Sequence, residues 1–576
     1  MALLLTGTAA ALAGPEGDVF EVSPLETPQL VRVPLGLPDG ADRLATAAVE
    51  VLNCPDTDRC SEIYPGTYYH ACQPTAIAAP DADGNFLYPF AGDTAPEDEL
   101  PEVMAFYQVG KALAAAQALG LDGLAEPLQV VVNVRHYDAG SLADCADGSY
   151  DGAAPLEPID TAWFTTDGQG IGVDRTGFTM LLPQGHAVDL ALDGDVVHHE
   201  LGHAVMASLA PGLPRTRLDE HGTDPSPGGL HEGFADLLAV MVSGDPVIGE
   251  YAGSGIDDGS PLRDLGDDAR CPDDLTGEAH ADSRPFTSAV WAARQTVAGS
   301  DEERAGVFDR AIMSAWIRLG DDAGYQRAAS LIAQELEAAL GADAGSSARA
   351  IFAEHGMDGC GGRVVDAASG KPLALLPAVA DPERGGTAPA IFQLRLELDR
   401  RASDIALEVA GFDTGTPDAT DVTALLSTSG EPIRWTLDGE PASDADLSTP
   451  LAVDADRHGR AVFAGPFEPG VYHLQLANHG GRATLYDTRA TAIESPIDDG
   501  GCSCNAAGTR SQPFTIFALL LVLFRNRRQA TGNGRQATGD NRSPMPVACC
   551  LSPVACCFLL SRGATRGRLR EPARRR

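Results

Sequence analysis

The sequence predicts an α+β fold with a mixed N-terminal part, a mainly helical middle and a β-rich C-terminal part. Residues 102–185 combine one helical stretch with several β-branched runs, which is typical of a mixed lobe. From about residue 190 to 358 apolar residues recur at helical spacing, and after residue 361 short alternating strands are separated by turns. The length of 576 residues leaves room for three or four domains of roughly 150 residues each.

Composition narrows the class of partner. The formal net charge is −41, and such an acidic surface repels nucleic-acid phosphates, so we expect no nucleic-acid partner. The hydrophobic fraction of 44% is ordinary and allows a sizeable core. Six of the 12 cysteines are scattered, and in an exported chain they allow up to three disulfides in about fifteen pairings: Cys54, Cys60, Cys72, Cys145, Cys271 and Cys360.

The first residues are typical of a secretory signal. Residues 1–13 form an apolar run that ends in Ala-Leu-Ala, as in a signal peptide cleaved before Gly14. The basic segment that usually precedes such a run is missing, so we expect a start upstream of Met1; the alternative is a plain apolar N-terminus. Residues 14–54 are β-rich and punctuated by proline, and we interpret them as an N-terminal extension or part of a pro-segment.

The helices and strands of the next region, residues 55–361, follow from the spacing of apolar residues. The expected strands lie at residues 127–137, 161–174 and 177–185. The expected helices lie at residues 102–123, 193–210, 231–244, 283–297, 304–320, 324–341 and 346–357. Asp193 or Asp195 is the expected N-cap of the second helix, and Gly244 is expected to end the third.

Residues 362–496 predict a β-sandwich domain. Seven short stretches of alternating apolar and polar residues are separated by turn residues, a pattern typical of a sandwich. These stretches lie at residues 364–376, 391–398, 404–412, 421–427, 459–467, 470–478 and 483–491. No candidate catalytic residue lies in them, so we expect that removing residues 362–576 leaves catalysis intact.

The middle of the chain carries the motif HHELGH. His199 and His203 stand four residues apart with Glu200 between them, so on a helix the two imidazoles share one face and can hold one zinc ion. The alternative is an amphipathic helix with surface histidines. A metzincin would need glycine and histidine where Met206 and Leu209 stand, which excludes that class.

A zinc site needs a third protein ligand, and HEGFAD offers one. Glu232 follows His203 by 29 residues and is expected near the start of its own helix. Asp236, one turn later, can accept the N–H of a zinc-binding histidine and fix its tautomer. The alternative for Glu232 is a first-turn acid that complements the helix dipole, and His221 is the other candidate ligand.

HHELGH followed by HEGFAD resembles the glutamate-zincin metallopeptidases, the group that holds the thermolysin-like and fungalysin-like enzymes. The resemblance covers roughly residues 55–358. It implies a two-lobed zincin-type domain at 55–361, with a mixed β/α N-terminal lobe and a helical C-terminal lobe. It also implies one catalytic zinc ion and Glu200 as general base.

Further residues fall in the order of that family. Ala162, in TAWF, resembles part of the edge strand that binds substrate backbone. Leu262 and Arg263 resemble the pocket leucine and the substrate-binding arginine, and Val196 would line the same apolar pocket. His280 resembles the catalytic histidine that steadies the transition state, placed just ahead of a helix. An apolar pocket implies a preference for a bulky apolar residue after the scissile bond.

The chain departs from the family at two points. Pro214 stands where the family has a transition-state tyrosine, about fifteen residues after the first zinc histidine. The acidic partner of the catalytic histidine is not clearly placed, and Asp274 or Glu278 can serve.

The family's calcium sites are partly echoed. Asp195, Asp245 and Glu250 can offer oxygen ligands for Ca²⁺. His198 and His231 flank the two zinc motifs, and we interpret both as bystanders.

The C-terminal tail suggests anchoring. Residues 497–528 hold a GCSC motif, an apolar run at 513–524 that is short of the ~20 residues of a membrane span, and an arginine cluster. This arrangement resembles the sorting tail of myxobacterial surface proteins, in which a cysteine marks processing and anchoring; an ordinary short tail anchor is the alternative. The pentapeptides RQATG and PVACC each occur twice near residues 529–576. We interpret this segment as a disordered tail that arises from a translated DNA repeat or a frameshift.

The sequence therefore predicts an exported or surface-anchored zinc endopeptidase that cleaves proteins or peptides through a zinc-activated water. It gives no indication of oligomeric state. The alternative is a surface adhesion or binding protein on a degenerate peptidase scaffold. Glu200 favours the enzyme, because a scaffold without activity has no reason to keep a general base beside its metal ligands.

Overall fold

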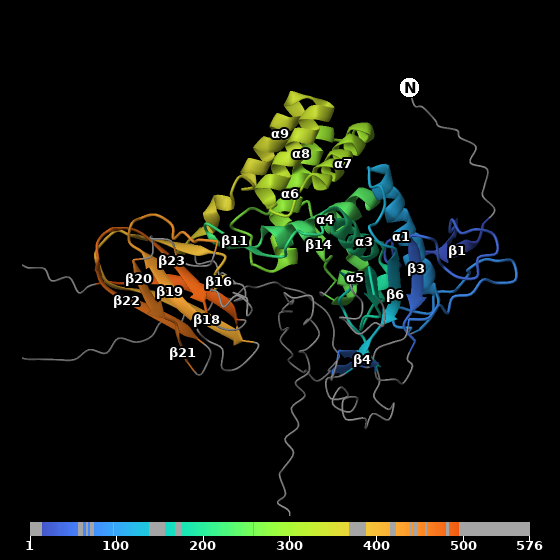
Figure 1. Cartoon of the computed structure of the whole chain (residues 1–576), viewed down its shortest axis with the longest axis horizontal. Helices are drawn as coiled ribbons and strands as arrows, with labels where there is room; N and C mark the ends of the chain where they lie inside the picture. The colour runs from blue at the N-terminus through green and yellow to red at the C-terminus, as the bar shows by residue number, and fades with distance from the viewer. Residues whose placement is uncertain are drawn as a thin grey trace, which may run out of the picture.

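The structure is a computed structural model (Figure 1). It describes residues 14–55, 61–64, 67–69, 74–95, 97–137, 156–166, 176–256, 259–367, 388–414, 422–437, 441, 446–454, 458–479 and 483–494. The predicted signal peptide, the GCSC tail with its apolar run and repeats, and Cys60, Cys72 and Cys145 lie outside these residues. Among the described residues, no helix is both long and apolar enough to cross a membrane.

The N-terminal lobe is built on a four-stranded sheet of order β3-β6-β10-β9. Its first three strands are parallel, and β9 runs antiparallel at the edge. The strands are β3 (Val49–Asn53), β6 (Leu128–Val134), β9 (Trp163–Thr165) and β10 (Thr179–Pro183). Helix α1 (Leu100–Ala118) packs against β3 and β6, and buried β-branched residues of β6 form the core beneath it. Because β3 lies within residues 14–54, that segment contributes to the lobe itself.

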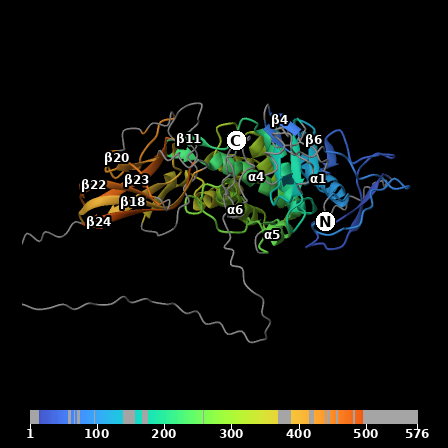
Figure 2. The same cartoon turned by 90° about the horizontal axis from the view of Figure 1, so that it is seen from below.

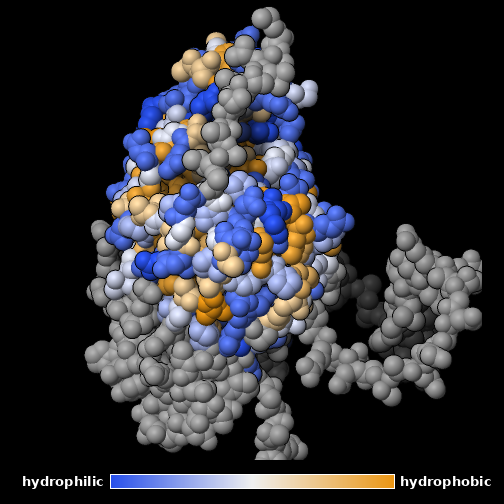
Figure 3. Space-filling view, turned by 90° about the vertical axis from the view of Figure 1, so that its right-hand side faces the viewer, coloured by the Kyte–Doolittle hydropathy of each residue, from blue (hydrophilic) through white to orange (hydrophobic). Residues whose placement is uncertain are grey.

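Three short hairpins accompany this sheet: β1 (Glu16–Val19) with β2 (Val31–Pro34), β4 (Ser61–Tyr64) with β5 (Thr67–Tyr69), and β7 (His136–Tyr137) with β8 (Leu156–Glu157). The face of the molecule toward this lobe is mostly hydrophilic, with scattered apolar residues (Figure 3). That distribution fits the strongly acidic composition.

Helices α3 (Gly194–Leu209) and α4 (Ser226–Ser243) lie side by side in the centre of the molecule (Figure 1). Asp193 caps α3, because its side chain accepts the N–H groups of Asp195 and Val196. The two helices approach closely at Gly202 of HHELGH, where a Cβ atom would lie 2.5 Å from the Cα atom of Ala235. Glycine at this position therefore lets the two motif-bearing helices come into contact.

The expected start of α4 at His231 is wrong by five residues. The helix begins at Ser226, and Pro227, Gly228 and Gly229 form its first turn. These residue types usually mark a turn, but close packing requires them here: a side chain at Gly229 would collide with the hydroxyl of Tyr325. The predicted C-terminus is confirmed, since Gly244 has a φ of 81°.

The middle of the chain is helical, as predicted. It contains a short helix, α5 (Glu250–Ile256), and four longer ones, of which α6 packs most closely against α4; the longer helices are α6 (Ala279–Ala298), α7 (Glu302–Ile317), α8 (Tyr325–Leu340) and α9 (Ala342–Glu354). Trp316 stacks on Phe234 of α4, with ring centroids 4.8 Å apart, which joins α7 to the central helices. A disulfide joins Cys271 to Cys360, and Cys54 is also disulfide-bonded.

The C-terminal β-region, residues 364–494, contains two sheets (Figures 1 and 2). One has the order β15-β17-β23-β19-β20 with β16 beside β23, and the other has the order β21-β22-β18-β24. The strands are β15 (Val364–Asp366), β16 (Ala388–Pro389), β17 (Gln393–Leu398), β18 (Ala402–Thr414), β19 (Val422–Ser427), β20 (Leu447–Pro450), β21 (Ala452–Val453), β22 (Gly459–Phe467), β23 (Gly470–Asn478) and β24 (Ala483–Glu494). The predicted α+β class is therefore confirmed.

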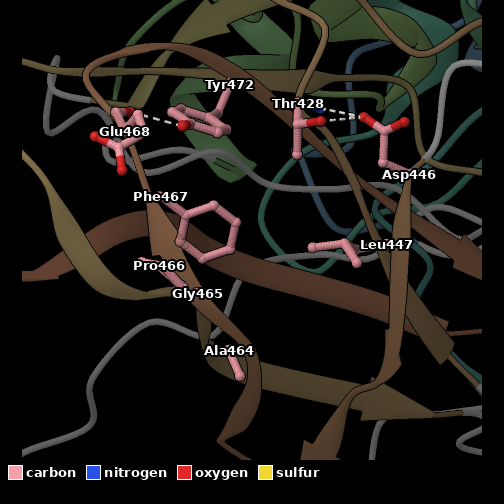
Figure 4. A pocket seen from close by; sticks show the side chains of 9 residues that line it. All are labelled: Thr428, Asp446, Leu447, Ala464, Gly465, Pro466, Phe467, Glu468 and Tyr472. Atoms are coloured by element: carbon pink, nitrogen blue, oxygen red, sulfur yellow. Dashed lines mark hydrogen bonds between the residues drawn. The ribbon is translucent and has the colours of Figure 1, made fainter.

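A cavity of about 480 Å³ opens in this region between residues of both sheets (Figure 4). Leu447 and Tyr472 of one sheet and Phe467 of the other line it, and Thr428 donates a hydrogen bond to Asp446 at its rim.

Candidate metal centre

His199 and His203 of α3 and Glu232 of α4 meet at one buried point. The Nε2 atoms of the two histidines lie 3.4 Å and 3.2 Å from Oε2 of Glu232. The three candidate ligand atoms lie within 4.8 Å of one another, and each side chain is less than a tenth exposed. Because Glu232 lies well inside α4, the alternative role as a first-turn acid is excluded.

This group of atoms suits a zinc ion. Two imidazole nitrogens and one carboxylate oxygen form a ligand set that zinc takes in catalytic sites, with a fourth position left open. Oε2 of Glu232 is buried and lies 3.4 Å and 3.2 Å from the Nε2 atoms of His199 and His203, so an acceptor oxygen and two ring nitrogens converge on one point. A metal cation between these atoms would be held by all three side chains.

Asp236 and Arg263 hold the first histidine from behind. Oδ1 of Asp236 lies 2.7 Å from Nδ1 of His199, which leaves Nε2 free to point at the triad. Nε of Arg263 donates to both oxygens of the Asp236 carboxylate, at 3.0 and 2.9 Å, and Nη2 donates to Oδ1 at 2.7 Å. The predicted position of Asp236 is thus observed. Arg263, predicted to bind substrate, spends at least two of its N–H groups on Asp236.

The pKa values of His199 and Glu232 show that positive charge is stabilised between these side chains. Burial lowers the pKa of His199, but hydrogen bonds with Asp236 and Glu232 outweigh it and raise that pKa to about 9. Burial raises the pKa of Glu232, but His280 and His203 hold it well below its usual value. The carboxylates therefore favour positive charge at this point, which either a proton on the imidazole or a metal cation in its place can supply.

Glu200 stands beside the triad on α3. Its side chain is buried, and Oε2 has no hydrogen-bond partner within the described part of the chain. Val196 lies one turn earlier on the same helix face and is buried. A buried carboxylate oxygen without a partner, on the residue that follows a candidate zinc ligand, can serve as a general base.

His280 completes the group from a third helix. Its Nε2 atom lies 3.2 Å from Oε2 of Glu232, and its Nδ1 atom lies 2.7 Å from Oε1 of Glu278. Of the two acidic partners left open by the sequence, the structure selects Glu278, since Asp274 accepts a hydrogen bond from the backbone of Arg270 instead. Burial lowers the pKa of His280, but Glu232 and Glu278 together raise it above its ordinary value.

The expectation that His280 precedes a helix is wrong. Helix α6 begins at Ala279, because the side chain of Glu278 accepts the N–H of Ala281 and caps the helix. The helix expected from the sequence starts at residue 283, four residues later than the observed start.

The predicted substrate-binding residues lie around the same helices. Ala162 directly precedes β9, which is the edge strand of the N-terminal sheet and contacts α3. Leu262 directly precedes β14 (Arg263–Asp264). The backbone N–H of Leu262 donates to the backbone oxygen of Ile248 in β13 (Val247–Ile248). Their roles in substrate binding stay predictions.

The histidines judged to be bystanders have other partners. His198 pairs with Gln108 through Nε2 at 3.0 Å, and burial lowers its pKa to about 3. His231 pairs through Nε2 with the backbone oxygen of Leu213 at 3.0 Å. His221, the other candidate for the third ligand, lies at the tip of a hairpin against the C-terminal β-region.

Sequence reasoning missed Arg215. Pro214 occupies the position of the family tyrosine, and the next residue, Arg215, places Nη1 2.9 Å from Oε1 of Glu232. Its side chain is 48% exposed, whereas that of Glu232 is 6% exposed. The one sequence feature that pointed to Arg215 is its place directly after Pro214, where the family has its tyrosine.

A second acidic group lies at the start of α3. Glu26, Asp195 and Glu250 bring carboxylate oxygens within 4.8 Å of one another. Two of the predicted calcium ligands, Asp195 and Glu250, thus lie together with Glu26, whereas Asp245 is exposed and outside this group; their role in binding calcium stays a prediction. The segment around Glu26 looked like an extension, and its return onto α3 is a tertiary contact that no local pattern reports.

Comparisons with known proteins find a likeness among solved structures. No protein-family model matches the chain, and no curated protein matches it. Among solved structures, the precursor of protealysin, a metalloproteinase from Serratia proteamaculans, matches at 16% sequence identity over 54% of this chain and 88% of that chain, with a TM-score of 0.34. We base the assignment of the site on its geometry alone. The predicted resemblance to the glutamate zincins is confirmed there: the HHELGH helix and the HEGFAD helix bring a buried His-His-Glu triad to one point.

Proposed function

We propose that the chain is a zinc-dependent endopeptidase that hydrolyses peptide bonds in proteins. The observation that carries the proposal is the convergence of His199, His203 and Glu232, with the carboxylate of Glu200 free beside them. A structural metal site is closed by four protein ligands, whereas this one has three among the described residues, with a general base in the same motif.

The side chains divide the work of hydrolysis. Zinc, when bound by the triad, supplies a Lewis acid that polarises water and the substrate carbonyl. Glu200 takes a proton from the attacking water and returns it to the leaving amine. His280, whose Nδ1 atom is held by Glu278, donates a hydrogen bond from Nε2 to the oxygen that gains negative charge. Arg263 holds Asp236, which in turn fixes the His199 ring.

The edge strand suggests how a substrate binds. β9 is antiparallel to β10 and is the last strand of its sheet within the described residues, so an extended peptide can lie alongside it. Val196 and Leu262 would receive a bulky apolar side chain after the scissile bond. This mode of binding suits proteins or peptides in an extended conformation.

Export and anchoring are part of the proposal. The signal-like residues 1–13, the GCSC tail and the disulfide between Cys271 and Cys360 support an exported protein held at the cell surface. The two sheets of the C-terminal β-region would form a β-sandwich accessory domain.

A calcium ion at the second acidic group is also part of the proposal. Oδ1 of Asp195 and Oε2 of Glu250 are buried without a hydrogen-bond partner in the described residues, and Glu26 supplies a third oxygen. Added Ca²⁺ should raise the melting temperature of the protein, and Asp195→Asn should remove that effect.

A degenerate scaffold is the second candidate function, favoured by Pro214 in place of the tyrosine. The deciding experiment measures bound zinc by elemental analysis and cleavage of an unfolded protein with and without a chelator. Stoichiometric zinc with chelator-sensitive cleavage is expected. Zinc without cleavage would favour the scaffold, and no zinc would reject the metal centre.

A further inference from the structure

We propose that the C-terminal β-region positions the metal centre: it holds the hairpin β11–β12, and through this hairpin it keeps the guanidinium of Arg215 on the zinc ligand Glu232. The proposal rests on the proposed function in one respect, namely that Glu232 is a metal ligand. It makes Arg215 a positioning residue and gives the C-terminal β-region a part in the peptidase site.

Arg215 contacts the side of Glu232 that faces away from the histidines. Oε2 of Glu232 points at the Nε2 atoms of His199 and His203, while Oε1 accepts the hydrogen bond from Nη1 of Arg215 at 2.9 Å. The two carboxylate oxygens thus have separate tasks. A hydrogen-bonded cation on Oε1 keeps the carboxylate plane turned so that Oε2 stays at the metal position.

The segment that carries Arg215 is fixed by the same helix that carries Glu232. The backbone oxygen of Leu213 lies 3.0 Å from Nε2 of His231, in α4. The backbone oxygen of Arg215 approaches Gly228 so closely that a Cβ atom there would lie 2.6 Å from it. Arg215 is therefore placed by its backbone as well as by its ion pair.

The chain runs from Arg215 directly into the hairpin formed by β11 (Arg217–Asp219) and β12 (Gly222–Asp224). Nε of Arg217 donates to Asp224 at 2.9 Å, and Oδ1 of Asp224 accepts the N–H of Ser226, the first residue of α4. One end of the hairpin thus leads to Arg215, and the other leads to the helix of Glu232. A shift of the hairpin would disturb both sides of their contact.

A hairpin with three-residue strands is too short to be stable by itself. Its support comes from the C-terminal β-region, which lies against it (Figure 1). Arg363, the residue directly before β15 and the C-terminal β-region, is 5% exposed in its side chain and donates from Nη1 and Nη2 to the two oxygens of Asp219, at 2.8 and 2.5 Å. Nε of Arg363 also donates to the backbone oxygen of Ile391 at 3.1 Å, so the arginine joins the hairpin to the first sheet. Fork-shaped pairing of this kind fixes orientation as well as distance.

The tip of the hairpin is held through its backbone. Nε2 of Gln475 donates to the oxygen of His221 at 2.9 Å, and the N–H of Trp435 donates to the oxygen of Glu220 at 3.0 Å. Gly222 has a φ of 118°, and a Cβ atom there would lie 2.7 Å from Nε2 of Gln475. Contacts with both tip residues and a close approach at a glycine indicate a specific docked position.

Removal of residues 362–576 is therefore expected to lower zinc affinity and catalysis, in contrast to the expectation from the sequence. Arg363 and Gln475 lie in that range, and both hold the hairpin. Among the contacts of the C-terminal β-region described above, only those with the hairpin lead to a metal ligand. Loss of these contacts is therefore expected to affect the metal centre.

The test uses the full-length zinc protein and measures zinc affinity by competition with a chelator, together with kcat and KM. Arg215→Ala should lower zinc affinity by about 10–100-fold and lower kcat more than KM rises. Arg215→Lys should restore part of both, because the ammonium can still donate to Oε1. Asp219→Asn, at the docking contact, should give a smaller loss in the same direction.

Arg460→Ala is the matched control, since Arg460 pairs with Glu408 on an exposed part of the second sheet and should leave zinc affinity unchanged. Arg215 is half exposed, so its loss should not unfold the chain, and thermal unfolding of each variant confirms this. If Arg215→Ala bound zinc as tightly as the parent protein, the role of Arg215 would be overturned. The proposed function would still stand, because the parent protein binds zinc. A loss in Arg215→Ala without one in a folded Asp219→Asn would overturn the role of the C-terminal β-region. Absence of zinc from the parent protein itself would reject the proposed function instead.

Discussion

Asp236 lies 2.7 Å from the Nδ1 atom of His199, and the guanidinium of Arg263 closes over the same carboxylate. An acceptor behind Nδ1 fixes the tautomer in which Nε2 carries the lone pair, which a metal requires. The carboxylate is fully buried, so it needs the arginine as a counter-charge. The three groups therefore act as one unit.

This unit predicts that both partners of His199 affect metal binding. Asp236→Asn should lower zinc affinity by about 10–100-fold, because the amide is a poorer acceptor for the imidazole N–H. Arg263→Ala should lower zinc affinity as well as turnover, because Asp236 loses its counter-charge. Chelator competition on both variants is the measurement. If Arg263→Ala weakened turnover and left zinc affinity at the parental level, the arginine would act on the substrate alone, as the sequence suggested.

The two glutamates of the two His-Glu pairs should behave differently. Glu200→Gln keeps all three ligands, so zinc should stay stoichiometric while turnover falls by about 10²–10⁴-fold, since an amide cannot accept the proton. Glu232→Ala removes a ligand, so zinc and turnover should both be lost. Elemental analysis beside initial rates separates the two cases. Full activity in Glu200→Gln would place the catalytic centre elsewhere.

The sequence predicted the triad and its partner Asp236 because these residues stand at helical spacings. His199 and His203 are four residues apart, and Asp236 is four residues after Glu232, so each helix presents its pair on one face. Local pattern sufficed there. Gly202, between the two histidines, then lets α3 and α4 come together.

Other parts of the site could not be predicted, because they depend on tertiary contacts. Arg215 reaches Glu232 only because the backbone of its segment is held by α4, and Glu26 reaches Asp195 only because an N-terminal turn folds back onto α3. The docking of the hairpin on Arg363 joins residues more than a hundred positions apart. No periodicity or motif encodes such pairs, since each is specified by the folded arrangement alone.

His280 and its partner offer a test of charge stabilisation that does not involve ligand loss. His280→Ala should lower kcat by about 10²–10³-fold, with zinc retained, because a donor to the developing oxygen charge is removed. Glu278→Gln should have a smaller effect, since the histidine stays but its Nδ1 atom loses the carboxylate that holds it. The measurement is kcat and KM with zinc content as control. A rise in KM alone would assign His280 to ground-state binding.

A buried carboxyl far from the metal predicts the pH dependence of stability. Glu102, in the first turn of α1, accepts hydrogen bonds from the side chain of Asn53 and the backbone N–H groups of Ile77 and Ala78. These bonds lower its pKa, but burial outweighs them and raises that pKa to about 7, from 4.5. Since the folded value lies above the unfolded one, the contribution of Glu102 to stability is present below pH 4.5 and is lost as the pH rises through 7.

Glu102→Gln removes this titration and keeps an acceptor oxygen for Asn53. The free energy of unfolding of the variant, relative to the parent, should therefore improve by about 2–3 kcal/mol between pH 5 and pH 8. Urea unfolding of both proteins at several pH values is the measurement, and Glu303→Gln, at an exposed position of α7, is the control whose difference from the parent should stay flat. A flat difference for Glu102→Gln as well would show that Glu102 is ionised throughout this range. The hydrogen bonds from Asn53, Ile77 and Ala78 would then outweigh the cost of burying its charge.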